Sequence, residues 1–60
     1  MQIRKINIIL ITFRQDYNLT QEQLGNIIEA SQSQISKWEN EINIPSTLRI
    51  KDILRILNVE

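Results

Sequence analysis

The sequence contains no cysteine and no histidine. Without cysteine, the chain has neither a disulfide framework nor a thiolate metal site. Without histidine, it lacks the commonest metal ligand and the commonest acid–base catalyst. Its serine and threonine hydroxyls have no histidine to activate them, and its carboxylates are scattered singly along the chain. We therefore expect a protein that is not an enzyme and that needs no metal or cofactor.

The sequence also has no excess of positive or negative residues and no long apolar segment. Seven Lys and Arg balance seven Asp and Glu, so the net charge of zero gives no overall attraction to nucleic acid or membrane. The longest apolar run, Ile8 to Ile11, is far shorter than the ~20 residues of a membrane span. The first residues include no small-residue cleavage site that would mark a signal peptide. We expect a cytoplasmic protein without membrane contacts.

The length allows a single domain, residues 1–60. A chain of 60 residues buries only about 60% of the surface that its unfolded form exposes, so its core has little stability to spare. The apolar fraction of 42% is sufficient for a globular core. Because there is only one glycine and one proline, capping residues must mark the helix boundaries.

Residues 3–17 carry apolar side chains at alternating spacings of three and four, which predicts one apolar stripe on a helix. The stripe consists of Ile3, Ile6, Leu10, Phe13 and Tyr17. The β-branched Ile8, Ile9 and Ile11 favour a strand in part, so residues 6–13 are ambiguous by themselves. The segment that follows decides for a helix.

Two capping patterns, eleven residues apart, mark two helix starts. Thr20 can accept a hydrogen bond from the main chain three residues on, and Gln23 can reach back to Thr20. Ser31 and Gln34 repeat this pattern. The spacing leaves room for a first helix at about 20–28 and a turn of two or three residues. Two short helices joined so tightly must cross steeply, which is a helix-turn-helix unit.

A last helix follows Pro45, with Ser46 as its cap. Its apolar residues lie at i, i+3, i+4 and i+7, as on one helix face; they are Ile50, Ile53, Leu54 and Leu57. Asn58 can take the left-handed conformation that ends a helix. The sequence therefore predicts an all-α fold of four helices without a sheet.

Four segments of the sequence form a linked pattern. They are Phe13-Arg14, residues 19–25 (Leu-Thr-Gln-Glu-Gln-Leu-Gly), residues 31–40 (Ser-Gln-Ser-Gln-Ile-Ser-Lys-Trp-Glu-Asn) and Pro45-Ser46. Together they resemble the phage-repressor-like (Xre-type) helix-turn-helix family, over residues 10–59. The resemblance implies a lambda-repressor-like fold of four or five helices, with the helix-turn-helix at about 20–40. It also implies sequence-specific binding of duplex DNA, usually as a dimer.

Two positions depart from the family pattern. The family usually has glycine in the turn between the two helices, where this chain has Glu29; a positive φ there would cost on the order of 1 kcal/mol. Glycine and basic residues often follow the recognition helix, where this chain has Glu41, Ile42 and Asn43. We expect this loop to supply few phosphate contacts.

A helix over residues 31–42 would separate polar from apolar side chains. Steps of 100° gather Gln32, Ser33, Ser36, Lys37 and Asn40 on one arc, and Ile35, Trp38, Glu39 and Ile42 on the opposite, core-facing arc. In a helix-turn-helix the second helix lies in the major groove of DNA. There Gln32 could bond adenine twice, serine could bond bases or phosphates, and Lys37 could reach guanine or a phosphate.

The resemblance adds roles for residues outside this arc. It implies that Gln21 holds a DNA phosphate and that Arg14 and Glu39 form a buried ion pair. Gly25 would let the two helices approach closely. The candidate DNA-binding residues are Gln21, Ser31, Gln32, Ser33, Ser36, Lys37 and Asn40. For Arg49, Lys51 and Arg55 of the last helix, a solvated face is the default expectation.

Two functions remain open. The first is a small transcriptional regulator, most simply a repressor, that binds a palindromic operator in double-stranded DNA as a homodimer. The second is a protein-interaction module, such as an antitoxin or a subunit that acts through a partner protein. The acid-free polar arc favours DNA, whereas the neutral net charge favours a protein partner.

Overall fold

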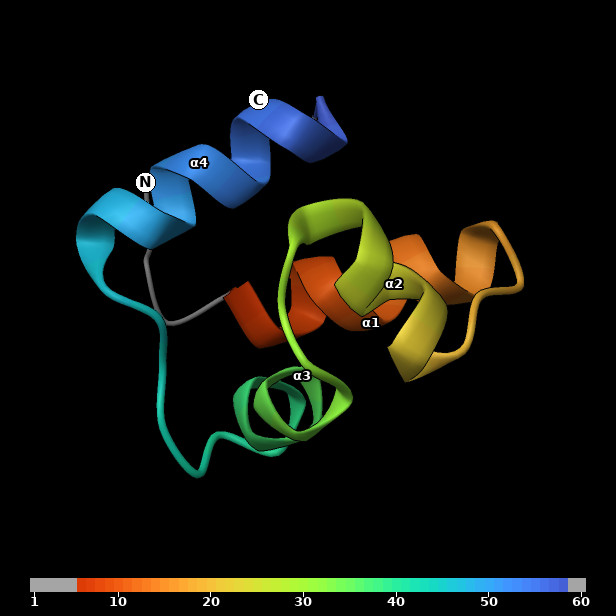
Figure 1. The fold of residues 1–60 in the computed structure, drawn as a ribbon, viewed down its shortest axis with the longest axis horizontal. Coiled ribbons are helices and arrows are strands. Elements are labelled where there is room, and N and C mark those ends of the chain that lie inside the picture. Colours follow the sequence, from red (N-terminus) through yellow and green to blue (C-terminus); the bar gives the residue numbers. More distant parts are fainter. Residues whose placement is uncertain (1–5, 59–60) are drawn as a thin grey trace.

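The structure is a computed structural model that describes residues 6–58. These residues form four helices, α1 (Ile6–Asp16), α2 (Gln21–Ile28), α3 (Gln32–Glu39) and α4 (Thr47–Leu57), and no strand (Figure 1). The expected all-α fold of four helices is confirmed for these residues. Part of the predicted first helix, residues 3–5, lies outside the described residues.

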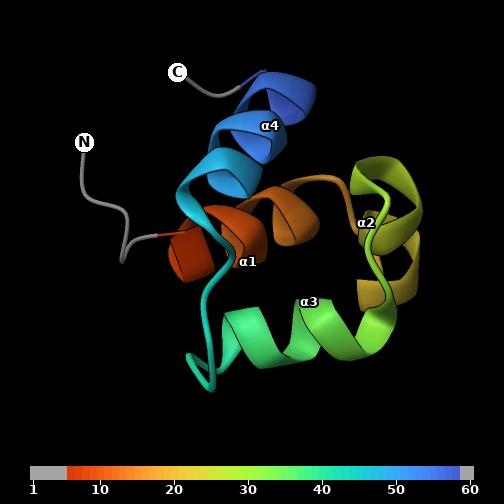
Figure 2. The same ribbon diagram turned by 60° about the vertical axis from the view of Figure 1, so that its left-hand side comes forward.

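The helices α2 and α3 pack against each other at a steep angle, joined by a short turn (Figure 1). α1 packs against α3, and α4 packs against α2. Figure 2 shows α1 between the other elements, with α3 along one edge of the molecule and α4 at the opposite side. This arrangement leaves the outer side of α3 uncovered by the other described helices.

Every helix contributes to one apolar core. The buried apolar side chains are Ile6, Leu10, Leu24, Ile28, Ile35, Trp38, Ile50, Ile53, Leu54 and Leu57. The stripe expected on the first helix is buried at Ile6 and Leu10 and partly buried at Phe13. Tyr17 is exposed, because α1 ends one residue before it and the chain has already turned away from the core. Its place in the stripe was predicted wrongly.

The predicted helix starts are confirmed by their hydrogen bonds. The Thr20 hydroxyl accepts from the Gln23 amide at 3.0 Å, and the Gln23 side chain accepts from the Thr20 amide at 2.8 Å. Ser31 and Gln34 form the same reciprocal pair, with both bonds at 3.1 Å. Ser46 caps α4 by accepting from the Arg49 amide at 3.2 Å. Each cap satisfies main-chain donors that a helix start leaves without partners.

A left-handed residue lies at or just after the end of each described helix. These residues are Asn18, Glu29, Glu41 and Asn58, with φ between 55° and 61°. The positive φ expected for Glu29 is therefore confirmed, at 61°. Asparagine tolerates this conformation, whereas glutamate pays on the order of 1 kcal/mol for it. The single glycine, Gly25, lies at none of these helix ends.

The helix predicted over residues 31–42 is shorter than expected. α3 ends at Glu39, Asn40 is its C-cap, and Glu41 turns the chain with a φ of 59°. The side chain of Ile42 is consequently 70% exposed rather than on the core side. The 100° steps fail there because residue 42 is no longer helical.

Candidate nucleic-acid interface

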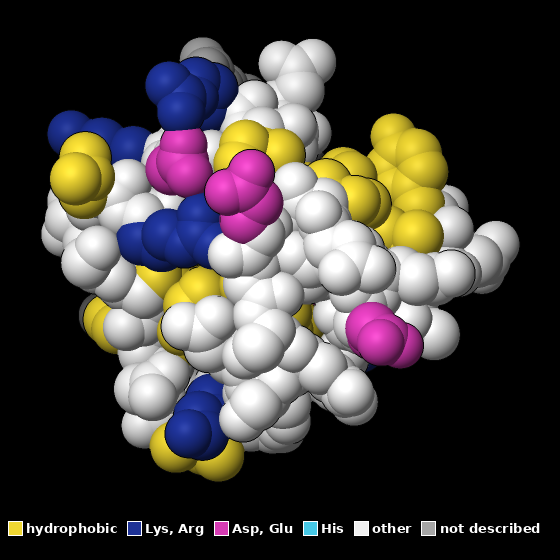
Figure 3. Space-filling view, viewed as in Figure 1, with side chains coloured by type: hydrophobic (Ala, Val, Ile, Leu, Met, Phe, Trp, Pro, Cys, Tyr) yellow, Lys and Arg dark blue, Asp and Glu magenta, His cyan; other side chains and the backbone are white. Residues whose placement is uncertain are grey.

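The outer face of α3 carries polar side chains that point away from the core. Gln32, Ser33, Lys37 and Asn40 are exposed, and Ser36 is half-buried. Ile35, Trp38 and Glu39 are buried on the opposite side. The surface around α3 in Figure 3 is mostly white, the colour of uncharged polar side chains and backbone. The predicted division of α3 into two faces therefore holds within the helix.

In the first turn of α3, the side chains that follow the N-cap residue are exposed. Ser31 is occupied as the N-cap, since its hydroxyl accepts from the Gln34 amide. Gln32 and Ser33 are the first two helical residues, and both are exposed. In a helix-turn-helix, this first turn is the part that meets base edges in the major groove.

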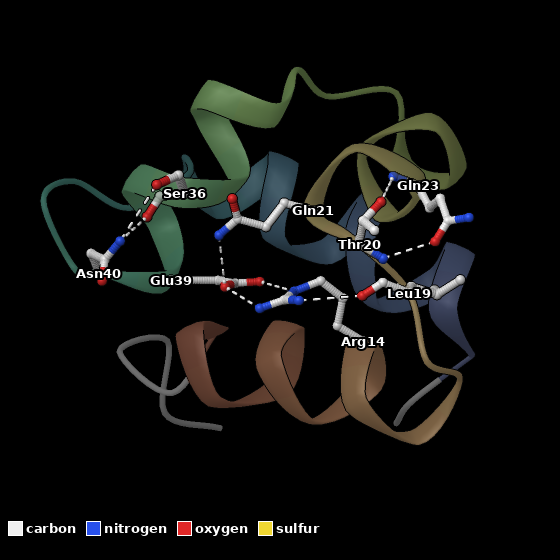
Figure 4. Close-up of polar contacts among 8 residues, drawn as sticks. All are labelled: Arg14, Leu19, Thr20, Gln21, Gln23, Ser36, Glu39 and Asn40. Atoms are coloured by element: carbon white, nitrogen blue, oxygen red, sulfur yellow. Dashed lines mark hydrogen bonds and ion pairs between the residues drawn. The ribbon is translucent and has the colours of Figure 1, made fainter.

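The last turn of α3 is stabilised by its own side chains. The Asn40 amide nitrogen donates to the Ser36 carbonyl oxygen at 2.9 Å, and it lies 3.5 Å from the Ser36 hydroxyl (Figure 4). Asn40 thus satisfies a carbonyl near the helix end. Both side chains have a structural role, and Asn40 keeps its exposed position on the outer face.

Behind this face, Arg14 and Glu39 form the expected ion pair. Arg14 Nε and Nη2 donate to the two Glu39 carboxylate oxygens at 2.8 and 2.9 Å, and Nη1 donates to the Leu19 carbonyl at 3.2 Å (Figure 4). The Glu39 side chain is only 5% exposed. Hydrogen bonding to this carboxylate raises the pKa of Arg14 above its ordinary value. The only carboxylate of α3 is therefore buried and neutralised.

Gln21, at the first position of α2, joins this pair. Its amide nitrogen donates to Glu39 Oε1 at 3.1 Å, so Glu39 receives hydrogen bonds from α1 and α2 together (Figure 4). The resemblance had implied a phosphate contact for Gln21, and this inward bond was not expected. An amide nitrogen carries two N–H donors, so one donor of Gln21 is still left for a phosphate.

Gly25 lies in the middle of α2, where the chain folds back over it. A Cβ at this position would overlap the Ala30 carbonyl oxygen and lie 3.3 Å from the Ala30 carbonyl carbon. The Ala30 amide also donates to the Gly25 carbonyl at 2.8 Å. Gly25 thus allows a close approach, as expected, but the segment that approaches it is the main chain of the turn before α3 and not α3 itself.

A sequence model of the helix-turn-helix family matches residues 10–60. The chain belongs to the phage-repressor-like (Xre-type) helix-turn-helix family. It is accordingly a DNA-binding regulator of the helix-turn-helix type. Its motif consists of α2 and α3, and α3 is the second helix, which is termed the recognition helix in such motifs. Neither a curated protein nor a solved structure matched the chain.

Arg49 of α4 contacts the helix-turn-helix, which the sequence did not indicate. Its Nη2 donates to the carbonyl oxygens of Ile28 and Glu29 at 2.6 and 2.9 Å, and its Nη1 pairs with Asp52 at 3.1 Å. The default expectation of a solvated side chain is wrong for Arg49. The i,i+3 spacing to Asp52 could have indicated the ion pair, but the carbonyl partners lie about twenty residues away in the sequence.

The helix-turn-helix carries little charge around its recognition helix. Lys37 is the single cation of α3. Beyond the helix, the exposed Glu41 accepts a hydrogen bond from the side-chain amide of Asn7 at 3.3 Å.

None of the helices within residues 6–58 has the length and apolar character that crossing a bilayer would require.

Proposed function

We propose that residues 1–60 form a single cytoplasmic domain that represses transcription by occupying an operator in double-stranded DNA. The observation that carries this proposal is the outer face of α3. It presents uncharged polar side chains and Lys37, while the one carboxylate of α3, Glu39, is buried against Arg14. Such a face approaches DNA without charge repulsion. Occupying a site excludes other proteins from it, which suits a domain this small.

Residues in the first half of α3 would make most of the contacts that recognise the DNA sequence. Gln32 has the amide needed for a bidentate contact to adenine, and Ser33 and Ser36 can bond base edges or phosphates. Lys37, one turn further along, suits guanine or a phosphate oxygen. The exposure of Gln32, Ser33 and Lys37 supports these assignments.

The remaining contacts would position the domain on the DNA backbone. We assign the second N–H of Gln21 to a phosphate, with the first held by Glu39. Ser31 and Asn40, at the two ends of α3, are further candidates for backbone contacts. These residues would set the register of α3 on the duplex without carrying sequence information.

We further propose that the protein binds as a homodimer. A single recognition helix makes too few base contacts for a useful ratio of specific to non-specific affinity. Two copies related by a two-fold axis double the contacts and require a palindromic operator, with half-sites about one helical turn, ~34 Å, apart.

A protein-interaction module is the second candidate. Ile42 and Ile44 in the loop after α3, and Leu48 at the start of α4, have exposed apolar side chains. The zero net charge also gives no long-range attraction to DNA. An antitoxin or a subunit of a larger assembly would use such a surface against its partner protein.

Selection of bound duplexes from a random DNA pool at moderate salt separates these candidates. An enriched palindrome with half-sites about ten base pairs apart is the expected result. A reporter promoter that carries this palindrome should then lose activity when the protein is expressed. Enrichment of one half-site would contradict the dimer. No enrichment at any salt concentration would contradict DNA reading and favour the protein partner.

A further inference from the structure

We propose that Arg49 of α4 is a positioning residue for DNA binding, because it holds the turn that sets the angle of α3. This inference rests on the proposed function of α3. Arg49 belongs to α4, at the side of the molecule opposite to α3 in Figure 2, and its Nη2 is bound to the end of α2, so in this proposal it acts through the turn rather than by touching DNA.

The end of α2 supplies the groups that Arg49 binds. The last carbonyl groups of a helix have no partner within the helix, and they form the negative end of its dipole. In α2 the Glu29 and Ala30 amides both turn back to the Gly25 carbonyl. The Ile28 and Glu29 carbonyls instead receive Arg49 Nη2, at 2.6 and 2.9 Å. The guanidinium of Arg49 therefore caps the C-terminal end of α2: its positive charge opposes the negative end of the helix dipole, and its N–H groups bind the free carbonyls.

Arg49 is itself held in place. Asp52, three residues further along α4, accepts from Nη1 at 3.1 Å. The guanidinium carbon lies 6.0 Å from the centroid of the buried Trp38 ring, at the edge of the range for a cation–π contact. Only 26% of the Arg49 side chain is exposed. One side chain thus links α4 to the end of α2 and to the core side of α3.

The turn depends on this link because it is short and strained. It runs from Glu29 to Ser31, and Glu29 holds a left-handed conformation that disfavours glutamate. Among the described residues, Arg49 is the only side chain outside α2 and α3 that hydrogen-bonds to the turn. Base contacts require side chains to be held within a fraction of an ångström, so a loosened turn would misplace Gln32 and Ser33.

Arg55 provides a matched control on the same helix. It pairs with the same Asp52 as Arg49, but its side chain is 76% exposed and no hydrogen bond joins it to α2. In the region of α4, Figure 3 shows Lys and Arg side chains beside Asp and Glu side chains; the single carboxylate of α4 itself is Asp52. Removing Arg55 therefore changes the charge and the ion pairing of α4 as much as removing Arg49, and leaves the α2 end intact.

The test compares Arg49→Met, Arg49→Lys and Arg55→Met with the unmodified chain. Affinity for the selected duplex is measured by fluorescence anisotropy at a temperature where circular dichroism shows each protein to be folded. We expect Arg49→Met to weaken binding roughly tenfold and Arg55→Met by less than about twofold. Arg49→Lys should be intermediate, because lysine keeps the charge and loses the planar fork with which Nη1 bonds Asp52 while Nη2 bonds the two carbonyls.

Hydrogen exchange gives a second readout at the turn. We expect the Ala30 amide to exchange faster in Arg49→Met than in Arg55→Met, because its bond to Gly25 lies beside the lost guanidinium. If Arg49→Met unfolds, the comparison is made in a Glu29→Gly background, which relieves the strain in the turn.

The outcomes are distinguishable. Unchanged affinity and exchange in folded Arg49→Met would overturn the positioning role while leaving the proposed function intact. A lower melting temperature with unchanged affinity would reduce Arg49 to a stabilising residue and likewise overturn it. If the unmodified chain binds no duplex, the proposed function fails and the positioning role fails with it.

Discussion

Arg14 and Glu39 are joined by two hydrogen bonds of 2.8 and 2.9 Å, although 25 residues separate them in the sequence. The pair connects α1 to the recognition helix and anchors the Gln21 amide as well. Because hydrogen bonding to Glu39 raises the pKa of Arg14, the arginine stays charged up to strongly alkaline pH. On the alkaline side, its contribution to stability is lost as the pH rises through that raised pKa.

Replacing Arg14 tests the structural role of this pair. Arg14→Ala leaves the Glu39 carboxylate buried without its partner, so the free energy of unfolding should fall by about 3 kcal/mol. Urea denaturation measures this change. The exposed Arg55→Ala should lose less than about 1 kcal/mol. A thermal melt that Arg14→Ala leaves unchanged would contradict the role.

Replacing Gly25 tests the contact with the turn. Alanine is the better helix former by about 1 kcal/mol, yet its Cβ would overlap the Ala30 carbonyl. We expect Gly25→Ala to destabilise the protein by about 2 kcal/mol, and Gly25→Leu to unfold it. The neighbouring, exposed Asn26→Ala should be neutral or slightly stabilising. A normal circular-dichroism spectrum for Gly25→Leu would refute this account.

Replacing Glu29 tests the strain at the end of α2. Its φ of 61° suits glycine, so Glu29→Gly should stabilise the protein by up to about 1 kcal/mol. The Arg49 bond is to the Glu29 main chain and survives the change. For a domain of this size, the melting temperature would rise by about 4 °C or more for each 1 kcal/mol. Glu22→Gly, within α2, should lower it. A drop for Glu29→Gly would show that the left-handed turn is unstrained.

Replacing Gln32 tests the reading of bases. The side chain is exposed and makes no hydrogen bond within the described structure, so Gln32→Ala should leave the melting temperature nearly unchanged. Affinity for the selected duplex should fall by about 1–3 kcal/mol, and the preference at one base pair of each half-site should be lost. Repeating the duplex selection with this variant measures both. An unchanged consensus would mean that Gln32 reads no base.

Replacing Lys37 tests contact with the DNA backbone. If its ammonium neutralises one phosphate, Lys37→Ala should reduce the slope of log affinity against log salt by about 1 for each subunit. Lys51→Ala, an exposed lysine on α4, serves as the control and should leave the slope unchanged. Equal slopes for the two variants would exclude a phosphate contact at Lys37, and a loss of base preference would then assign it to guanine.

The starts of α2, α3 and α4 and the end of α4 could be predicted because their causes are local. The caps at Thr20, Ser31 and Ser46 and the left-handed Asn58 act within three or four residues along the chain. The two faces of α3 follow equally from the 100° step between helical residues. The Arg14–Glu39 pair was expected from the family resemblance, since its partners lie on different helices.

Other contacts depend on how the helices are brought together. The bond from Gln21 to Glu39 and the bonds from Arg49 to the end of α2 join segments 18 to 21 residues apart, and no local pattern predicts them. The exposure of Tyr17 and Ile42 was missed because each lies just beyond a helix end, where helical periodicity no longer applies. The helical segments and the polar face of α3 follow from the order of the residues alone, because capping hydrogen bonds and side-chain spacing within one helix specify both. The contacts that join α3 and its turn to α1 and α4 emerge from the packing of the helices, because they pair charged side chains with groups that are distant in the sequence.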